Sequence, residues 1–394
     1  MYTVHCIPFQ VYIAEIAPAK LKGLFGNCNQ LFMTFGQLFA YLYGIKQFKI
    51  QYWHFSLAAA GVVTLFEILM LFTYETPRWL FSKRKDFDAI RVLKILRGPN
   101  AKISKEINQI KAGIREKYTI PEQLKAFRHR AVFIPFILVL MLMFFQQFSG
   151  INAVIFYASD VFKKAGFKED KVNLVSAISI GVVQVIATLL SVMLVDKLGR
   201  KVLLTISSIG MGLSSFVLAI YYYILVHHCE GCLFPVCHHS NPLLDKASPC
   251  NTTNFGYLAV VCVVFFIISF SLAWGPIPWS MMSELMPNHV RTLAGSIATF
   301  INWTFAAIIT SCFHKYATFV TEAGAFWSFT IVMAFAVVLV IVFLPETKGH
   351  SLEEIQEHFE QGHIFAISCR RRANRPRSSV SHYSTTRSVS VADA

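Results

Sequence analysis

Residues 284–291 read Glu284-Leu285-Met286-Pro287-Asn288-His289-Val290-Arg291, and residues 15–22 read Glu15-Ile16-Ala17-Pro18-Ala19-Lys20-Leu21-Lys22. In both copies a glutamate and a basic residue are seven positions apart, and a proline follows the glutamate by three. Each copy is followed, after two long apolar stretches, by a second related motif: Glu75-Thr76-Pro77-Arg78 and Pro345-Glu346-Thr347-Lys348. The glutamates of the two motifs are 60 residues apart in the first copy and 62 in the second. The duplication predicts a polytopic membrane protein built from two parallel repeats.

The composition is that of an all-α membrane protein. Hydrophobic residues make up 55% of the 394 residues and charged residues 15%, whereas about 25% of the residues of a soluble domain are charged. The mean hydropathy is +0.52. A helix needs about 20 apolar residues to cross the hydrocarbon core, and eight stretches meet that length: 24–45, 53–74, 132–157, 172–195, 202–226, 255–281, 293–316 and 324–344. A large soluble helical core would need far more polar helix faces than these stretches contain.

The net charge of +14 is distributed unevenly, which gives an orientation. Residues 76–130 contain fifteen Lys and Arg against five Asp and Glu, whereas the loop 227–254 has one Lys and two acids. Basic loops stay in the cytoplasm, so the first segment is expected inside and the second outside. Nucleic-acid binding, the other reading of a basic chain, is not favoured, because the basic residues lie in loops that bound apolar spans.

These features divide the chain into four parts. Residues 1–75 are expected to be the remainder of an N-terminal transmembrane half, and residues 76–130 a cytoplasmic helical linker. Residues 131–344 form a six-helix half with the exofacial loop 227–254, and residues 345–394 a cytoplasmic tail that is disordered after about 363. Because the first repeat has two spans against six, about four more spans are expected before residue 1; the alternative is a genuine eight-span protein.

Seven motifs in register resemble the sugar-porter branch of the major facilitator superfamily, from about residue 8 to residue 360. They are Glu15…Pro18…Lys22-Gly23, Pro77-Arg78-Trp79, Gln146-Gln147-Phe148-Ser149-Gly150-Ile151-Asn152, Asp196…Gly199-Arg200-Lys201, Gly275-Pro276-Ile277-Pro278-Trp279, Asn302-Trp303 and Pro345-Glu346-Thr347-Lys348-Gly349. Within that branch the chain is similar to the animal facilitative glucose transporters with a long glycosylated ninth loop and to the arthropod facilitated trehalose transporters. The resemblance implies the major facilitator fold, N-terminally truncated, with eight transmembrane helices that correspond to helices 5–12 of twelve.

A sugar presents hydroxyls that both donate and accept, and its C–H faces are apolar. A neutral site for it needs carboxamides, which also do both, and an aromatic plate. The resemblance assigns contacts with a hexose to Gln30, Gln146, Gln147, Asn152, Gln184 and Trp279. A single intramembrane amide can instead join helices; for Asn302, a further deep amide, this structural role is favoured and sugar binding is the alternative. Gly150 is expected to loosen the helix between Gln147 and Asn152, so that these amides converge.

A second motif predicts a moving part. Proline lacks an amide donor and clashes with the carbonyl four residues earlier, so Pro276 and Pro278 free the carbonyls of Leu272 and Trp274. Broken helices at the membrane midplane mark substrate sites and gates. We therefore expect a hinge at Gly275, Pro276 and Pro278, the alternative being a passive kink.

The repeated charges predict a network at the cytoplasmic face that latches the two halves together when the protein opens outward. Its members are Glu15, Lys22, Arg78, Asp196, Arg200, Glu284 and Arg291. Exposed pairs contribute only about 0–1 kcal/mol each, which suits a latch that must reopen. The alternative is ordinary juxtamembrane charge that sets topology. Lys22 stands where the family usually has arginine, which weakens bidentate pairing there.

The exofacial loop and the tail carry candidate modification sites. In the loop, Asn251 opens a glycosylation sequon, and two disulfides are expected among Cys229, Cys232, Cys237 and Cys250; a zinc site with the neighbouring histidines is the alternative. In the tail, kinases are expected to act on serines that follow arginines: Ser378, Ser379 and Ser388.

The resemblance implies facilitative transport of a sugar, a hexose such as glucose, by alternating access. It implies a plasma-membrane protein with the lipid bilayer and a small sugar as partners, no cofactor or resident metal, and no enzymatic activity. The alternatives are a trehalose carrier, a proton-coupled sugar or polyol symporter, or a non-transporting truncated isoform or sensor. A symporter needs a titratable acid in the pathway, and Glu67 is the only carboxylate well inside a span. Ser271 and Ala306 replace polar residues that the family has at these positions, which fits a roomier pocket.

Overall fold

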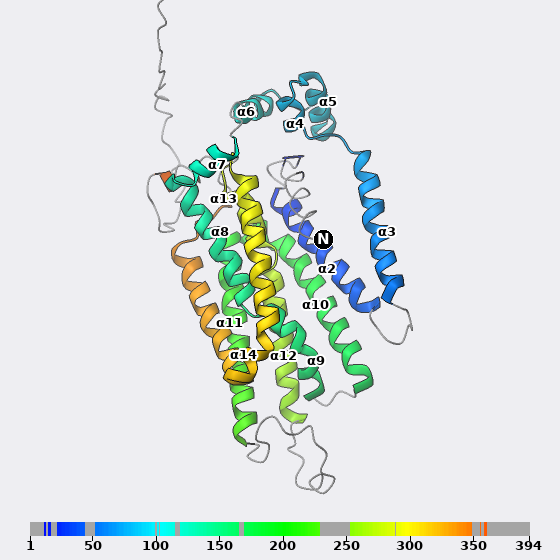
Figure 1. Ribbon diagram of the computed structural model, residues 1–394, viewed down its shortest axis with the longest axis vertical. Coiled ribbons are helices and arrows are strands. Elements are labelled where there is room, and N and C mark those ends of the chain that lie inside the picture. Colours follow the sequence, from blue (N-terminus) through cyan, green and yellow to red (C-terminus); the bar gives the residue numbers. More distant parts are fainter. Residues whose placement is uncertain are drawn as a thin grey trace, which may run out of the picture.

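The computed structural model describes residues 12, 15–16, 22–43, 52–98, 101, 103–114, 119–164, 169–228, 253–287, 289–348, 355 and 358–360. In this part of the chain every regular element is a helix, and the long helices other than α3 run side by side in one elongated bundle (Figure 1). The long helices are α2 (Lys22–Tyr43), α3 (Tyr52–Leu71), α8 (Arg130–Phe148), α9 (Ile151–Lys164), α10 (Glu169–Leu198), α11 (Arg200–His228), α12 (Thr253–Ser269) and α14 (Arg291–Val342). The short π-helix η3 (Phe270–Trp274) and helix α13 (Ile277–Leu285) follow α12.

Each of the eight apolar stretches predicted from the sequence coincides, over most of its length, with one or more helices of the described residues. Five helical segments of the described residues are long and apolar enough to cross a membrane: Arg130–Ile155, Ser176–Leu198, Arg200–Ile224, Tyr257–Leu285 and Arg291–Val342. The last contains two of the predicted stretches, because α14 is interrupted at Thr321, where φ is 72° and ψ 158°. After this residue the chain returns along the bundle in the opposite direction (Figure 1). The chain is therefore an all-α, multi-pass membrane protein.

Helix α3 stands beside the bundle rather than within it (Figure 1). Its side chains from Ser56 to Leu71 are exposed on every side although the helix is apolar. An apolar helix without a polar face is stable in contact with lipid or with other apolar helices. Its exposed surface therefore fits a membrane environment.

Four short helices cap one end of the bundle: α4 (Pro77–Ser82), α5 (Asp86–Arg97), α6 (Ser104–Ile114) and α7 (Ile120–Ala126) (Figure 1). Leu80, Phe81, Ala89 and Val92 form a small core of α4 and α5, against which Ile107 and Ile110 of α6 pack. Helix α7 begins with a capping box, in which Glu122 accepts from the backbone N–H and the hydroxyl of Thr119 at 2.7 and 2.8 Å. These two hydrogen bonds hold the pKa of Glu122 below its usual range.

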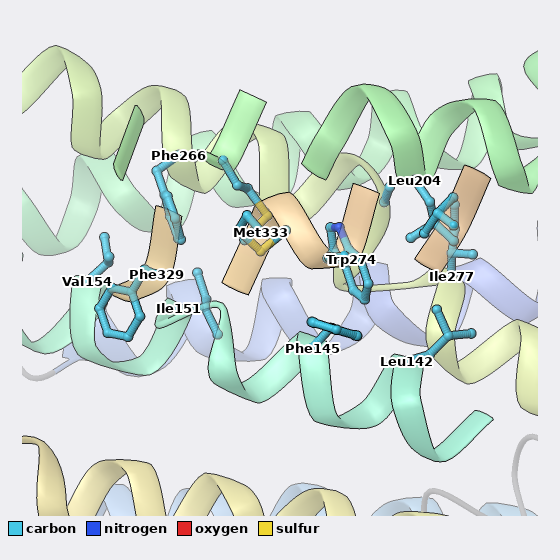
Figure 2. Packing of buried hydrophobic residues seen from close by; sticks show 14 of the residues in the cluster. Leu142, Phe145, Ile151, Val154, Leu204, Phe266, Trp274, Ile277, Phe329 and Met333 are labelled. Carbon is cyan, nitrogen blue, oxygen red and sulfur yellow. The ribbon is translucent and has the colours of Figure 1, made fainter. Parts of the chain in front are cut away.

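The main core lies where α8, α11, α12, η3 and α14 meet (Figure 2). Leu142, Phe266, Trp274 and Met333 have almost no exposed surface. The rings of Phe145 and Trp274 are tilted by 59° to each other with centroids 6.5 Å apart. This packing fixes α8 against the segment that follows α12, and that contact positions the candidate site.

Candidate sugar site

The straight helix α12 ends at Ser269, and a break predicted from the sequence follows it. Gly275 N–H donates to the carbonyl of Phe270, five residues back, at 2.9 Å, which closes one π-helical turn. Helix α13 then starts at Ile277 with Pro276 as its N-cap. Trp274 anchors the broken segment, because its indole Nε1 donates to Ser208 Oγ on α11 at 2.8 Å. The break is present; its function as a hinge stays a prediction.

A side chain of α8 donates hydrogen bonds to the backbone carbonyls that the break leaves without a helical partner. Gln146 Nε2 donates to the carbonyl of Trp274 at 2.7 Å and to that of Gly275 at 3.2 Å. Gln146 is only 3% exposed, and a buried carbonyl without a partner is unfavourable by about 1–3 kcal/mol. Gln146 therefore stabilises the broken segment and at the same time ties it to α8.

Four carboxamides form one hydrogen-bonded series, here called the amide chain: Gln146, Asn302, Gln147 and Asn152. Asn302 Nδ2 donates to Gln146 Oε1 at 2.8 Å, and Gln147 Nε2 donates to Asn302 Oδ1 at 3.1 Å. Asn152 Nδ2 donates to Gln147 Oε1 at 2.9 Å. The structure thus brings together three of the predicted site residues. It also adds Asn302, for which the sequence favours a structural role over sugar binding and which here connects two of the others.

Gly150 allows Asn152, the last member of the amide chain, to reach Gln147. Its φ of 86° separates α8 from α9, so that Asn152 reaches Gln147 across the break rather than along a continuous helix. A Cβ atom at Gly150 would lie 2.5–2.6 Å from ring carbons of Phe329. Figure 2 shows this ring beside the first turn of α9, near Val154. Both the backbone conformation and the close ring require glycine here.

The other three predicted site residues lie on three different helices around the break. Gln30 of α2 is close to it, since its Nε2 would be 3.6 Å from a Cβ atom at Gly275. Gln184 of α10 is 4% exposed, and its Oε1 has no hydrogen-bond partner among the described residues. Trp279 of α13 is partly buried and packs against the main core. None of the hydrogen bonds between described residues joins Gln184 or Trp279 to the amide chain.

A charge cluster lies at the end of the bundle near the short helices. Arg200 donates to Asp196 at 3.3 Å and to Glu284 at 3.2 Å, and its side chain is 9% exposed. Thr347 Oγ1 donates to the other oxygen of Glu284. The carboxylate of Glu346 accepts from the backbone N–H groups of Arg200 and Lys201, both at 3.0 Å. These contacts join the α10–α11 turn, the end of α13 and the segment after α14.

The remaining members of the predicted network lie on other elements. Arg291 donates to the carbonyl of Met286 at 3.2–3.3 Å, and Arg78 lies partly buried on α4. Glu15 is in a short helical segment, and Lys22 is the first residue of α2 with a side chain outside the described set. The ion pairs of Arg200 therefore join elements of the second half, and a latch between the two halves stays a prediction.

The segment that contains Glu15 and Ile16 contacts the short helices. Arg97 at the end of α5 donates to the carbonyl of Ile16 at 2.8 Å and pairs with Glu106 of α6 at 2.8 Å. This guanidinium is 15% exposed. The sequence analysis does not single out Arg97, because it carries no motif and is one of many basic residues in its segment.

Comparison with known proteins settles the family. Residues 3–359 match the family model "Sugar (and other) transporter". The chain belongs to this family. It is 35% identical over 357 residues to the facilitated trehalose transporter Tret1 of Bombyx mori, covering 90% of this chain and 66% of that protein. It is also 35% identical over 353 residues to the facilitated glucose transporter member 8 of solute carrier family 2 from Bos taurus, covering 89% and 70%. This chain of the sugar transporter family thus spans about two thirds of the length of these relatives.

Solved structures of the proton:xylose symporter XylE confirm the major facilitator fold. The structure bound to 6-bromo-6-deoxy-D-glucose matches with a TM-score of 0.71 and 29% identity, over 89% of this chain and 70% of that one. The inward-open conformation of XylE from E. coli matches with a TM-score of 0.58 and 26% identity, over 88% and 68%. The arrangement of this sugar transporter family member is thus more similar to that of the sugar-bound form.

Some predicted features of this family member lie outside the described residues. These are the cysteines Cys229, Cys232, Cys237 and Cys250, the glycosylation site Asn251, and the tail serines Ser378, Ser379 and Ser388. The structure therefore leaves their disulfides, glycan and phosphorylation as predictions.

Proposed function

We propose that this protein carries a neutral sugar across the membrane and binds it at the amide chain. The observation that carries the proposal is the set of four carboxamides held together deep in apolar helices, next to a helix break. Polar side chains within spans face the bundle interior and mark a substrate path. Carboxamides match sugar hydroxyls because both kinds of group donate and accept. Gln184 Oε1, which is buried without a partner among the described residues, would accept from a further hydroxyl.

The helix break couples sugar binding to movement of α13. Gln146 joins α8 to the carbonyls of Trp274 and Gly275, so a sugar that engages Gln146 acts on the start of α13. The end of α13 carries Glu284, which accepts from Arg200 of α11 at 3.2 Å, at the end of the bundle that the proposed orientation places on the cytoplasmic side. We propose that the described conformation is closed on that side and that α13 moves when it opens. The higher similarity to the sugar-bound than to the inward-open form of XylE supports this reading.

For the substrate we propose a hexose such as glucose, with trehalose as the second candidate. The relatives include both a facilitated glucose transporter and facilitated trehalose transporters. Ser271 in η3 and Ala306 on α14 are small, buried side chains, which favours a site with room for a larger sugar. Competition of a labelled hexose by unlabelled glucose, fructose and trehalose separates these substrates.

We propose passive uniport rather than proton coupling. The amide chain bonds to amides, to backbone carbonyls and to a thioether, and within the described residues none of these bonds involves a carboxylate. Glu67 lies on the exposed surface of α3, away from the amide chain. Sugar uptake into proteoliposomes with and without an inward proton gradient is the test. Accumulation above the external concentration that depends on the gradient would contradict uniport.

The site is tested by the double change Gln146→Leu and Gln147→Leu. A neutral hydrogen bond contributes about 0.5–1.5 kcal/mol, and a millimolar ligand binds with only about 4 kcal/mol in total, so saturable uptake should be lost. Gln37→Leu is the matched control, because Gln37 of α2 is a partly buried amide that bonds to Tyr41 at 3.1 Å. Retention of saturable uptake by the double variant would refute the site. Absence of sugar uptake by the parent protein and by both variants would favour a non-transporting sensor.

For the location we propose the plasma membrane, with α4–α7 and the C-terminus in the cytoplasm and kinases acting on the tail. The excess of basic residues in 76–130 supports this orientation. Protease protection of an epitope tag at the C-terminus in intact cells tests it, and cleavage from outside would contradict it.

A further inference from the structure

The orientation of every carboxamide in the amide chain is set from one end. The carbonyls of Trp274 and Gly275 only accept hydrogen bonds. The side chain of Gln146 must therefore turn its nitrogen toward them, as it does at 2.7 and 3.2 Å. Its oxygen then faces Asn302, so Asn302 must present its nitrogen there, and it does so at 2.8 Å.

The same reasoning continues to the far end. With its nitrogen on Gln146, Asn302 turns its oxygen to Gln147, which donates to it at 3.1 Å. Gln147 must then offer its oxygen to Asn152, which donates at 2.9 Å. Reversal of Gln146, Asn302 or Gln147 would place two donors or two acceptors face to face at each of its contacts in the series.

Asn302 is the only member of the series between the two glutamines, and it is almost fully engaged. It is 1% exposed, and its nitrogen also contacts Met143 Sδ at 3.4 Å. Both of its hydrogens are thus used, and it has little left to offer a ligand.

Counting the remaining groups shows what a ligand would meet. Gln146 has used both hydrogens and keeps one oxygen lone pair, so it can only accept. Counting the bonds between described residues, Gln147 keeps one hydrogen and one lone pair, and Asn152 keeps one hydrogen and both lone pairs of its oxygen.

We propose that Asn302 is a positioning residue that transmits the polarity of the helix break from Gln146 to Gln147 and thereby determines which sugar epimers the site accepts. The proposal rests on the proposed sugar site. A hydroxyl at Gln146 must donate, and the directions offered by Gln147 and Asn152 are fixed. An epimer that moves one hydroxyl loses a partner that a rotating amide would restore. Asn302 acts on the sugar through the two glutamines and does not itself bind it.

The first test compares Asn302→Leu with Thr299→Val in equilibrium binding of the preferred hexose and its epimers. Thr299 lies on the same helix, is 2% exposed, and its hydroxyl has no partner among the described residues, so Thr299→Val changes a buried polar residue without touching the amide chain. Asn302→Leu is expected to lower the ratio of the affinity for the preferred hexose to the affinity for an epimer. The expected decrease is about tenfold or more, which corresponds to about 1.4 kcal/mol. Thr299→Val should keep the ratio of the parent protein. A purely structural role for Asn302 would lower both affinities alike and leave the ratio unchanged, which would overturn the proposal.

The second test uses Asn302→Asp and remains informative if the leucine variant does not fold. An ionised aspartate only accepts, so it opposes Gln146 Oε1, whereas a protonated one donates through O–H and accepts through C=O with the polarity of asparagine. Among the described residues, the hydrogen-bond partners of Asn302 are two carboxamides and a thioether, none of which titrates. Sugar affinity of Asn302→Asp should therefore rise at least fivefold as the pH falls from about 8 to about 5, relative to the parent protein measured alongside.

The two tests separate the proposal from the function on which it rests. If the parent protein binds no sugar, the proposed function fails. If the parent binds sugar but Asn302→Asp has the pH profile of the parent, the proposed function stands and the role of Asn302 is refuted.

Discussion

Gly150→Ala is expected to destabilise the protein by about 2–5 kcal/mol. The φ of 86° is unfavourable for a residue with a Cβ atom by about 1–2 kcal/mol. The new methyl group would lie 2.5 Å from the ring of Phe329, and forcing a group into a packed core is unfavourable by about 1–3 kcal/mol. Because the break at Gly150 allows Asn152 to reach Gln147, the change should also weaken sugar binding.

Substitutions at two other glycines separate the contribution of the backbone conformation from that of the contact with Phe329. Gly36 lies inside α2 with open space where a Cβ would be, so Gly36→Ala should stabilise by about 0.5–1 kcal/mol. Gly98 has a φ of 95°, a ψ of 155° and open space, so Gly98→Ala should show only a backbone contribution, of about 1–3 kcal/mol. The double change Gly150→Ala and Phe329→Leu should be less destabilising than the sum of the two single changes, because the smaller side chain relieves the clash.

The assay is thermal unfolding of the purified protein in detergent, followed by intrinsic fluorescence at one scan rate for all variants because membrane proteins often unfold irreversibly. Sugar affinity is measured on the same preparations. If Gly150→Ala unfolds at the temperature of Gly98→Ala, the contact with Phe329 contributes nothing. If the unfolding temperature of Gly150→Ala equals that of Gly36→Ala, neither the backbone conformation nor the contact with Phe329 requires glycine at this position.

Three further changes test other parts of the structure. Trp279→Ala should lower sugar affinity about two- to tenfold with normal surface expression; unchanged competition binding would remove Trp279 from the site. Gln146→Leu should lower stability by about 2–4 kcal/mol, because it leaves two buried carbonyls without a donor, and thermal unfolding that equals the parent's would contradict this role. Glu346→Gln should lower stability by about 1–3 kcal/mol, because it weakens two charge-assisted bonds at the start of α11; a variant as stable as the parent would show that backbone capping there is dispensable.

The sequence predicts those features of the fold that depend on local chemistry. Apolar length predicts the helices, and the missing N–H groups of Pro276 and Pro278 predict the break after α12. The freed carbonyl of Trp274 is indeed open, and a side chain takes it. Gly150 likewise marks the end of α8, because its place between amides on an apolar helix has no other simple explanation.

Contacts between distant residues could not be predicted in the same way. Asn302 lies 155 residues after Gln147, and its place between two glutamines follows from how α14 packs on α8. Glu284 and Arg291 share a sequence motif, yet α13 ends at Leu285 and Pro287 follows. The carboxylate of Glu284 consequently accepts from Arg200 of a different turn. Spacing along the sequence indicates which charges gather at one face, but the three-dimensional packing decides which of them pair.

The most direct test of the account is a structure of the protein with its preferred sugar bound. The account predicts a sugar next to the break after α12, with a hydroxyl about 2.7–3.2 Å from Gln147 Nε2 or Oε1 and another donating to Gln146 Oε1. A sugar bound elsewhere, with the amide chain intact and without contact to it, would contradict the central claim.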